Sequence, residues 1–87
     1  MFNEICLIGK FSETPSLVEL NGRKAVKVSM DVIHDDDHDI IDNIISYYYC
    51  DTNIFSKCEK DMNVGIFGHA ETINNSTQII IDVFQLN

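Results

Sequence analysis

The pair Asn21-Gly22 constrains the fold more than any other feature of this sequence, because it stands between two segments with the pattern of β-strands. Asn-Gly in that setting is the strongest short-range signal for a hairpin, since a two-residue turn needs positive φ angles. Residues 23–33, which follow the pair, alternate in character. One face is nearly all apolar and should point to the core: Lys24, Val26, Val28, Met30 and Val32. The other face, with Arg23, Lys27 and Ser29, should be open.

Strand-like segments separated by turn signals extend over the rest of the chain. The first expected strand covers residues 3–11, and a short strand at 17–20 precedes the Asn-Gly turn. Further strands are expected at residues 44–51, 62–71 and 77–86. The pair Asn74-Asn75 predicts a hairpin turn before the last of them.

When residues 3–11, 23–33, 44–51, 62–71 and 77–86 are counted as strands one to five, with 17–20 as a short addition, a short helix is expected between the third and fourth strands. It would cover residues 52–60, with Thr52 or Asn53 as its N-cap. Its inward side chains would be Ile54, Phe55 and Cys58. This order of elements is that of an OB-fold barrel, in which closure removes exposed sheet edges. We therefore predict an all-β fold: a five-stranded OB-fold barrel with a short helix between strands 3 and 4. It should form a single domain over residues 1–87, without a C-terminal tail.

The first strand carries an unbroken apolar run, Ile5-Cys6-Leu7-Ile8, and ends at Gly9-Lys10. Because side chains alternate between the two faces of a strand, such a run indicates burial on both faces. The three cysteines, Cys6, Cys50 and Cys58, form no C-x-x-C pair and are odd in number. They are predicted to be reduced, mostly buried thiols rather than a disulfide framework or a zinc site.

Charge is distributed unevenly along the chain, which has a formal net charge of −8. Residues 1–30 hold four cations against three acids, whereas residues 31–61 hold nine acids against two lysines. The total has the wrong sign for a nucleic-acid-binding protein. A local basic face at the first hairpin can still attract phosphate, provided that the acidic segment points away from it.

Several classes of protein are excluded by what the sequence lacks. No catalytic motif, P-loop or dinucleotide fingerprint is present, so we do not expect an enzyme or a cofactor. Residues 34–39 hold ligand types for a divalent metal but lack the glycine and distal glutamate of an EF-hand, so 34–43 is interpreted as a solvated acidic loop without metal. There is no signal peptide and no apolar run of about 18 residues. We expect a cytoplasmic protein that does not contact a membrane.

Four stretches carry a resemblance to a known family, and together they touch nearly the whole chain: NEICLIGKF, ETPSLVELNGRKAVKVSMDV, MNVGIFGHAET and TQIIIDVFQL. In order and spacing they resemble the bacterial single-stranded-DNA-binding (SSB) family and the primosomal PriB-type proteins. The resemblance implies an OB-fold that binds single-stranded DNA. It also implies a homodimer or homotetramer that pairs through the first strand, and a replication or conjugation protein as a further partner.

Binding sites of this type combine a basic groove for phosphates with aromatic platforms for stacked bases. The cations that would contact phosphates are Lys10, Arg23 and Lys27, and the tyrosines that would stack on bases are Tyr47 and Tyr49. The alternative is that these cations are ordinary solvated charges and that the tyrosines simply pack within a strand. Strand alternation places at least one residue of the run 47–49 on the opposite face.

The sequence is compatible with two functions. The first is weak, largely sequence-independent binding of single-stranded DNA in replication, recombination or mobile-element transfer. The second is an acidic OB-fold module for protein–protein interaction that has lost DNA binding. The net charge of −8 and the absence of tryptophan favour the second.

Overall fold

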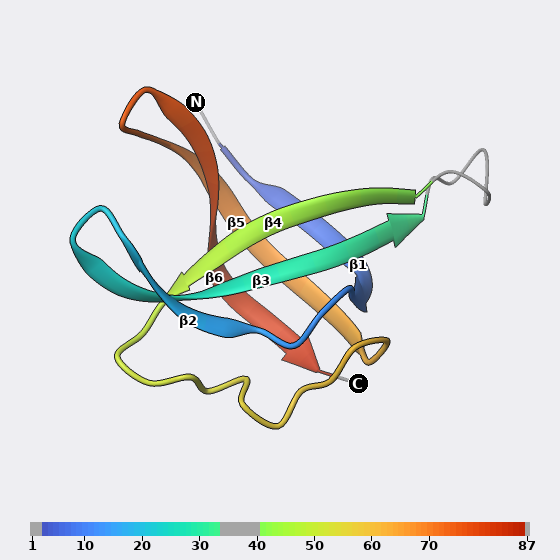
Figure 1. Ribbon diagram of the computed structural model, residues 1–87. Helices are drawn as coiled ribbons and strands as arrows, with labels where there is room; N and C mark the ends of the chain where they lie inside the picture. Colours follow the sequence, from blue (N-terminus) through green and yellow to red (C-terminus); the bar gives the residue numbers. More distant parts are fainter. Residues whose placement is uncertain (1–2, 34–40, 87) are drawn as a thin grey trace.

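The computed structural model describes residues 3–33 and 41–86, which form six β-strands (Figure 1). The strands are β1 (Ile5–Phe11), β2 (Ser16–Leu20), β3 (Arg23–Ile33), β4 (Ile41–Tyr49), β5 (Asn63–Ile73) and β6 (Ser76–Leu86). Residues 41–43, which were predicted to belong to the acidic loop, pair with β3 instead. Residues 34–40, and with them the prediction about metal-ligand types, lie outside the described residues.

Five of the strands close into a barrel, as the sequence predicts for an OB-fold. The order is β1-β5-β6-β4-β3-β2, and a further contact between β1 and β3 completes the ring. All pairings are antiparallel except that of β4 with β6. Strand β2 lies at the end of the strand order, outside the ring, and forms an antiparallel hairpin with β3.

Both predicted hairpin turns are confirmed by their backbone angles. Asn21 and Gly22 have φ of 53° and 77°, and Asn74 and Asn75 have φ of 50° and 66°. Two consecutive positive φ angles are the mark of a type I′ turn, whose twist matches that of the flanking strands. These turns align β2 with β3 and β5 with β6 in the observed register.

The core lies inside the barrel. The face of β3 that contributes to it is the one that the alternating sequence pattern predicted to be buried. Val26, Val28 and Met30 are fully buried there. The buried members of the cluster are Phe11, Val26, Val28, Met30, Phe55, Cys58, Val64, Ile66 and Ile81. Lys24 has the same parity but is exposed, because it lies at the start of the strand. The opposite face is less open than predicted, since Ala25 and Ser29 are also buried.

The predicted helix at residues 52–60 is wrong: the described part of the chain contains no helix, and this segment consists of turns. Its backbone bonds run from Ser56 to Asn53 and from Cys58 to Phe55, which is the three-residue spacing of turns. The Asn53 side chain also accepts a hydrogen bond from the Phe55 N–H at 3.0 Å, and such a local bond competes with a helical one. Phe55 and Cys58 are buried as predicted, whereas Ile54 is 45% exposed. No helix in residues 3–33 and 41–86 is long and apolar enough to cross a membrane.

The first strand is buried on one face only, so the prediction of burial on both faces is wrong for the single chain. Cys6 and Ile8 are exposed, and Ile8 retains 73% of its accessible surface. Of the three thiols, only that of Cys58 is fully buried, and this burial raises its pKa. The apolar run of β1 therefore presents half of its side chains outside the barrel.

Candidate nucleic-acid interface

A row of directly paired residues crosses the outside of the barrel over five strands. Ser16 pairs with Lys27, Lys27 with Tyr47, Tyr47 with Ile80, and Ile80 with His69. Directly opposite residues share one face of a sheet, so these side chains lie side by side. Lys27 and Tyr47 are half-buried, and Ile80 is buried beside them. Two of the predicted site residues, Lys27 and Tyr47, are thus immediate neighbours on an outer surface.

The other predicted pair, Arg23 and Tyr49, is also brought together. The Arg23 guanidinium carbon lies 3.8 Å from the centroid of the Tyr49 ring, so the guanidinium covers one face of the ring. Tyr48, between the two outward tyrosines, turns into the barrel, where its ring meets Phe55 and Phe84 edge-on at 6.1 and 5.4 Å. Alternation therefore divides the tyrosine run as expected, with two rings outside and one inside.

Lys10 lies apart from these two pairs. It is exposed at the end of β1, directly opposite Asp31 of β3. Asp31 is four residues beyond Lys27, or roughly 13 Å along a strand. A carboxylate at the directly opposed position reduces the positive potential that Lys10 can offer to a phosphate.

A polar network that was not predicted from the sequence joins Ser12, directly after β1, to β3 and β4. The Ser12 hydroxyl donates to the Ser29 hydroxyl at 2.6 Å, and the Asn43 amide donates to both serine hydroxyls at 3.0 Å. Asn43 also donates to the Asp31 carboxylate at 3.2 Å. These bonds satisfy the buried hydroxyl of Ser29 and tie β1 to the sheet at the point where the barrel closes.

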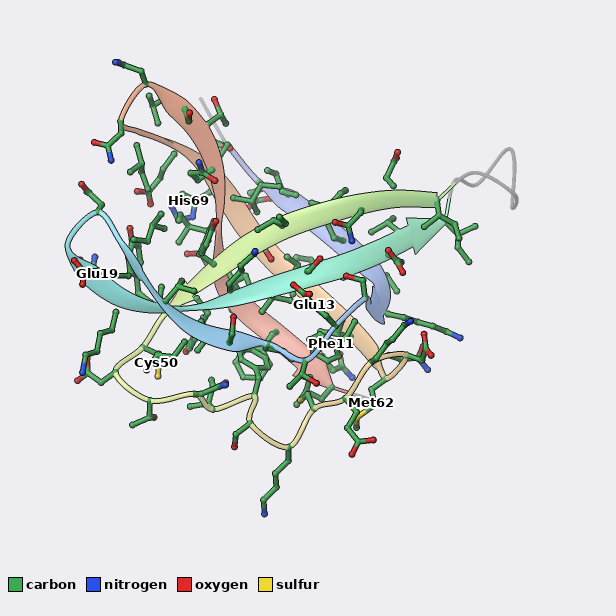
Figure 2. All side chains as sticks on the ribbon, in the orientation of Figure 1. Phe11, Glu13, Glu19, Cys50, Met62 and His69 are labelled. Atoms are coloured by element: carbon green, nitrogen blue, oxygen red, sulfur yellow. The ribbon has the colours of Figure 1, made fainter. Side chains whose placement is uncertain are left out.

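At the far end of the row lies His69, which Figure 2 labels, and its ring contacts two carboxylates. Its Nδ1 lies 2.7 Å from Asp82 and its Nε2 lies 2.5 Å from Glu71. Both hydrogen bonds raise the pKa of His69 above its ordinary value, and the bond to Asp82 has the larger effect. Asp82 reaches the histidine because a bulge between Phe67 and Gly68 shifts the register of β5 against β6. A protonated His69 offsets part of the negative charge at this end of the surface.

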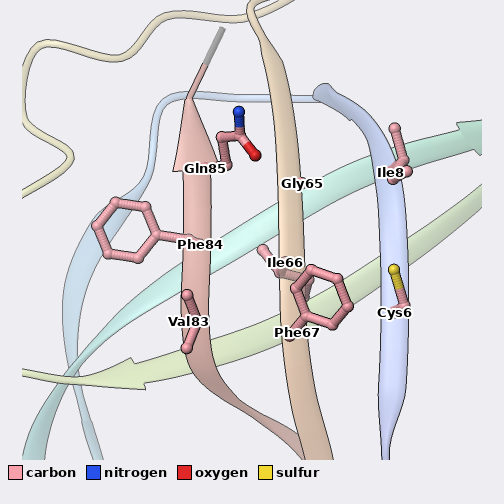
Figure 3. A pocket seen from close by; sticks show the side chains of 8 residues that line it. All are labelled: Cys6, Ile8, Gly65, Ile66, Phe67, Val83, Phe84 and Gln85. Atoms are coloured by element: carbon pink, nitrogen blue, oxygen red, sulfur yellow. The ribbon is translucent and has the colours of Figure 1, made fainter.

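A second outer surface lies on β1, β5 and β6 and is apolar. We call it the apolar strip and define it by Cys6, Ile8, Phe67 and Val83. Cys6 pairs with Phe67, which in turn pairs with Val83, so the strip crosses three neighbouring strands (Figure 3). Phe67 and Val83 are 59% and 62% exposed, which is unusual for large apolar side chains that lie in a contiguous group.

No protein-family model and no curated protein sequence matches the chain. Solved structures do match it. The dimeric N-terminal domain of the PriB protein from Thermoanaerobacter tencongensis superposes with a TM-score of 0.76 at 17% identity, covering 98% of this chain and 96% of that one. A small single-stranded DNA-binding protein from Streptomyces coelicolor superposes with a TM-score of 0.69 at 15% identity, covering 100% of this chain and 95% of that one.

These superpositions, together with the closed five-strand ring, define the class of protein. The chain is an OB-fold barrel. Within that class its fold is the one shared by SSB and PriB-type proteins, as the resemblance in the sequence led us to expect.

Proposed function

We propose that this protein binds single-stranded DNA, weakly and with little sequence preference, on the outer surface of β3 and β4. The observation that carries the proposal is the direct pairing of Lys27 with Tyr47 on that surface. A cation beside an aromatic ring is the minimal unit for single strands, since the charge follows the backbone while the ring stacks on a base. The Arg23–Tyr49 pair extends the same surface along both strands. The Streptomyces protein of the same fold is itself a single-stranded DNA-binding protein.

Affinity should be low because the favourable charges are few and the protein as a whole is acidic. The net charge of −8 repels DNA at long range, although salt screens this repulsion beyond a Debye length of about 8–10 Å. Lys10 is opposed by Asp31 and is expected to add less than Lys27. Roles in replication, recombination or mobile-element transfer, and a replication or conjugation protein as partner, remain predictions from the resemblance.

Replacing Tyr47 with alanine should weaken binding of a fluorescently labelled oligo-dT about ten-fold, because a stacked base contributes roughly 1–3 kcal/mol. Tyr47→Phe keeps the ring and is the matched control, with affinity expected near that of the wild type. Fluorescence anisotropy at several salt concentrations measures both the affinity and its salt dependence. The logarithm of the binding constant should fall with a slope of about −0.7 per contacted phosphate. No binding by the wild type at low salt and high protein concentration would show that the DNA proposal is wrong.

We further propose that the protein is a homo-oligomer, a dimer or a tetramer, built through β1. Residues 5–10 pair with β5 along one edge, and β3 joins the other edge only at Lys10 and Phe11. Within the described part of the chain, the remaining edge of β1 has no strand partner. An open edge beside exposed apolar side chains is a template for pairing with another strand. The PriB domain of the same fold is dimeric.

An Ile8→Asp substitution should convert the oligomer to a monomer, because it places a charge in the apolar strip beside the open edge. Ile54→Asp provides a matched control, since Ile54 is an exposed isoleucine that belongs neither to β1 nor to the apolar strip. Light scattering on both variants and on the wild type gives the masses directly. A wild type that is monomeric even at high concentration would refute pairing through β1.

The alternative function, an acidic module for protein–protein interaction, is favoured by one specific observation. The apolar strip exposes large side chains of three strands, while the formal net charge of the chain is −8. The oligo-dT titration separates the two functions. The interaction module becomes the better assignment if DNA binding is absent at low salt while the strip still holds an oligomer together.

A further inference from the structure

We propose that Arg23 and Tyr49 form a composite nucleobase subsite, in which the outer face of the Arg23 guanidinium stacks on a base. This inference rests on the proposed binding of single-stranded DNA and assigns Arg23 a role different from phosphate contact. Tyr49 would act from beneath, as the support that holds the guanidinium flat, rather than as the platform that the base touches.

The register of β3 and β4 builds the pair. Arg23 begins β3 directly after the Asn-Gly turn, and Tyr49 ends β4 opposite Ala25. A hydrogen bond of 3.2 Å from the Cys50 N–H to the Lys24 carbonyl keeps the two strands together past the end of β4. The guanidinium carbon lies over the ring, 3.8 Å from its centroid, next to the Ala25–Tyr49 pair and the Cys50–Lys24 hydrogen bond that hold the two strands together.

The geometry leaves the outer face of the guanidinium available. The group is planar and weakly hydrated, so it stacks on an aromatic ring with one face and can stack on a base with the other. Arg23 is exposed, and within residues 3–33 and 41–86 no carboxylate forms an ion pair with it. Tyr49 lies against the guanidinium on one side, so a base that approaches from the solvent side meets the guanidinium before the phenol ring.

The surroundings favour a base over a phosphate at this position. The pair borders a hollow that is lined by Gly22, Arg23, Lys24, Tyr49, Cys50 and Asp51. Asp51 contributes a carboxylate to the same hollow, and a like charge at short range opposes the entry of a phosphate. A base is uncharged and is not opposed in this way. Glu19 lies directly opposite Lys24 on β2, so a second carboxylate stands near this hollow.

An Arg23→Lys variant measures the contribution of stacking alone, because lysine keeps the positive charge but lacks the planar guanidinium group. Its affinity should be measured for an oligo-dT and for an abasic oligonucleotide of equal length, which has the phosphates without the bases. We expect about a ten-fold loss on oligo-dT, in line with one stacked base, and less than about a two-fold loss on the abasic strand. The salt slope should stay as in the wild type. Lys24→Gln is the matched control from the same hollow, with equal effects expected on both strands.

Unchanged oligo-dT affinity in Arg23→Lys, or equal losses on the two strands, would overturn the subsite. Tyr49→Ser gives a second test, since removing the support should cause the same loss on oligo-dT alone. Circular dichroism verifies that both variants are folded. The two proposals fail in different ways: a wild type that binds neither strand refutes DNA binding altogether. A wild type that binds oligo-dT while Arg23→Lys binds equally well refutes only the subsite.

Discussion

Substitution of Gly68 by alanine is expected to lower the free energy of unfolding by about 3 kcal/mol or more, which is a large share of the stability of a domain of this size. A Cβ at this position would overlap the carbonyl oxygen of Ile80, and it would lie 3.0 Å from the carbonyl carbon of Ile80 and 3.2 Å from the Cα of Ile81. All three atoms belong to the backbone of β6, beside the bulge, so no side chain can rotate away. Relief requires the two strands to separate.

Gly65→Ala is the matched control, because Gly65 lies on the same strand and its Cβ would have its nearest neighbours at 3.9 and 4.0 Å. Urea unfolding of both variants at one protein concentration gives the comparison, with Gly65→Ala expected near the wild type. Similar midpoints for the two variants would mean that β5 and β6 can separate freely at the bulge. Gly9 faces the carbonyl oxygen of Asp31 in the same manner, at the contact that closes the barrel.

Truncation of Phe55 to alanine should cost about 3–5 kcal/mol, the usual range for deletion of a buried aromatic side chain. Phe55 is fully buried, and its ring packs on those of Phe11, Tyr48 and Phe84 at centroid distances of 6.3, 6.1 and 4.6 Å. It comes from the turn segment between β4 and β5, so it also anchors that segment to the barrel. Its loss would leave a cavity and free the connection.

The neighbouring Ile54 supplies the control for this experiment, because its side chain is 45% exposed. Ile54→Ala should cost less than about 1 kcal/mol. The free energies of unfolding come from urea titrations followed by circular dichroism. Should Phe55→Ala be as stable as Ile54→Ala, the aromatic cluster cannot be what fixes the 50–62 segment.

The strands and turns were predictable because their signals are local. The alternating pattern of residues 23–33 predicted the buried face of β3. The pairs Asn21-Gly22 and Asn74-Asn75 predicted the positions of the two hairpin turns. The helix was not predictable, because Asn53 and the three-residue turns satisfy the backbone of 52–60 in another way. The exposure of Ile8 was missed for a different reason: an unbroken apolar run does not tell whether a strand is covered by its own chain or by a second one.

The candidate site was predictable as a set of residues but not as an arrangement. Parity alone placed Tyr47 and Tyr49 outside. The contact of Arg23 with Tyr49 depends on the register of β3 against β4. Likewise, Lys10 lies opposite Asp31 because β1 pairs with β3 at that point. The cluster of His69, Asp82 and Glu71 depends on a bulge, and no short-range signal in the sequence indicates that bulge.

The ring of the barrel is joined by two short seams. Strand β1 meets β3 through two residue pairs, and β4 meets β6 through two more, one of which involves Ser46, whose buried hydroxyl has no hydrogen-bond partner. Every other pairing in the ring is longer, so the ring divides into two halves, β1-β5-β6 and β3-β4, with β2 attached to β3 outside the ring. The first half carries the apolar strip, and the second carries Lys27, Tyr47, Arg23 and Tyr49. The two surfaces therefore share no residue and no strand, so a substitution in one leaves the side chains of the other in place.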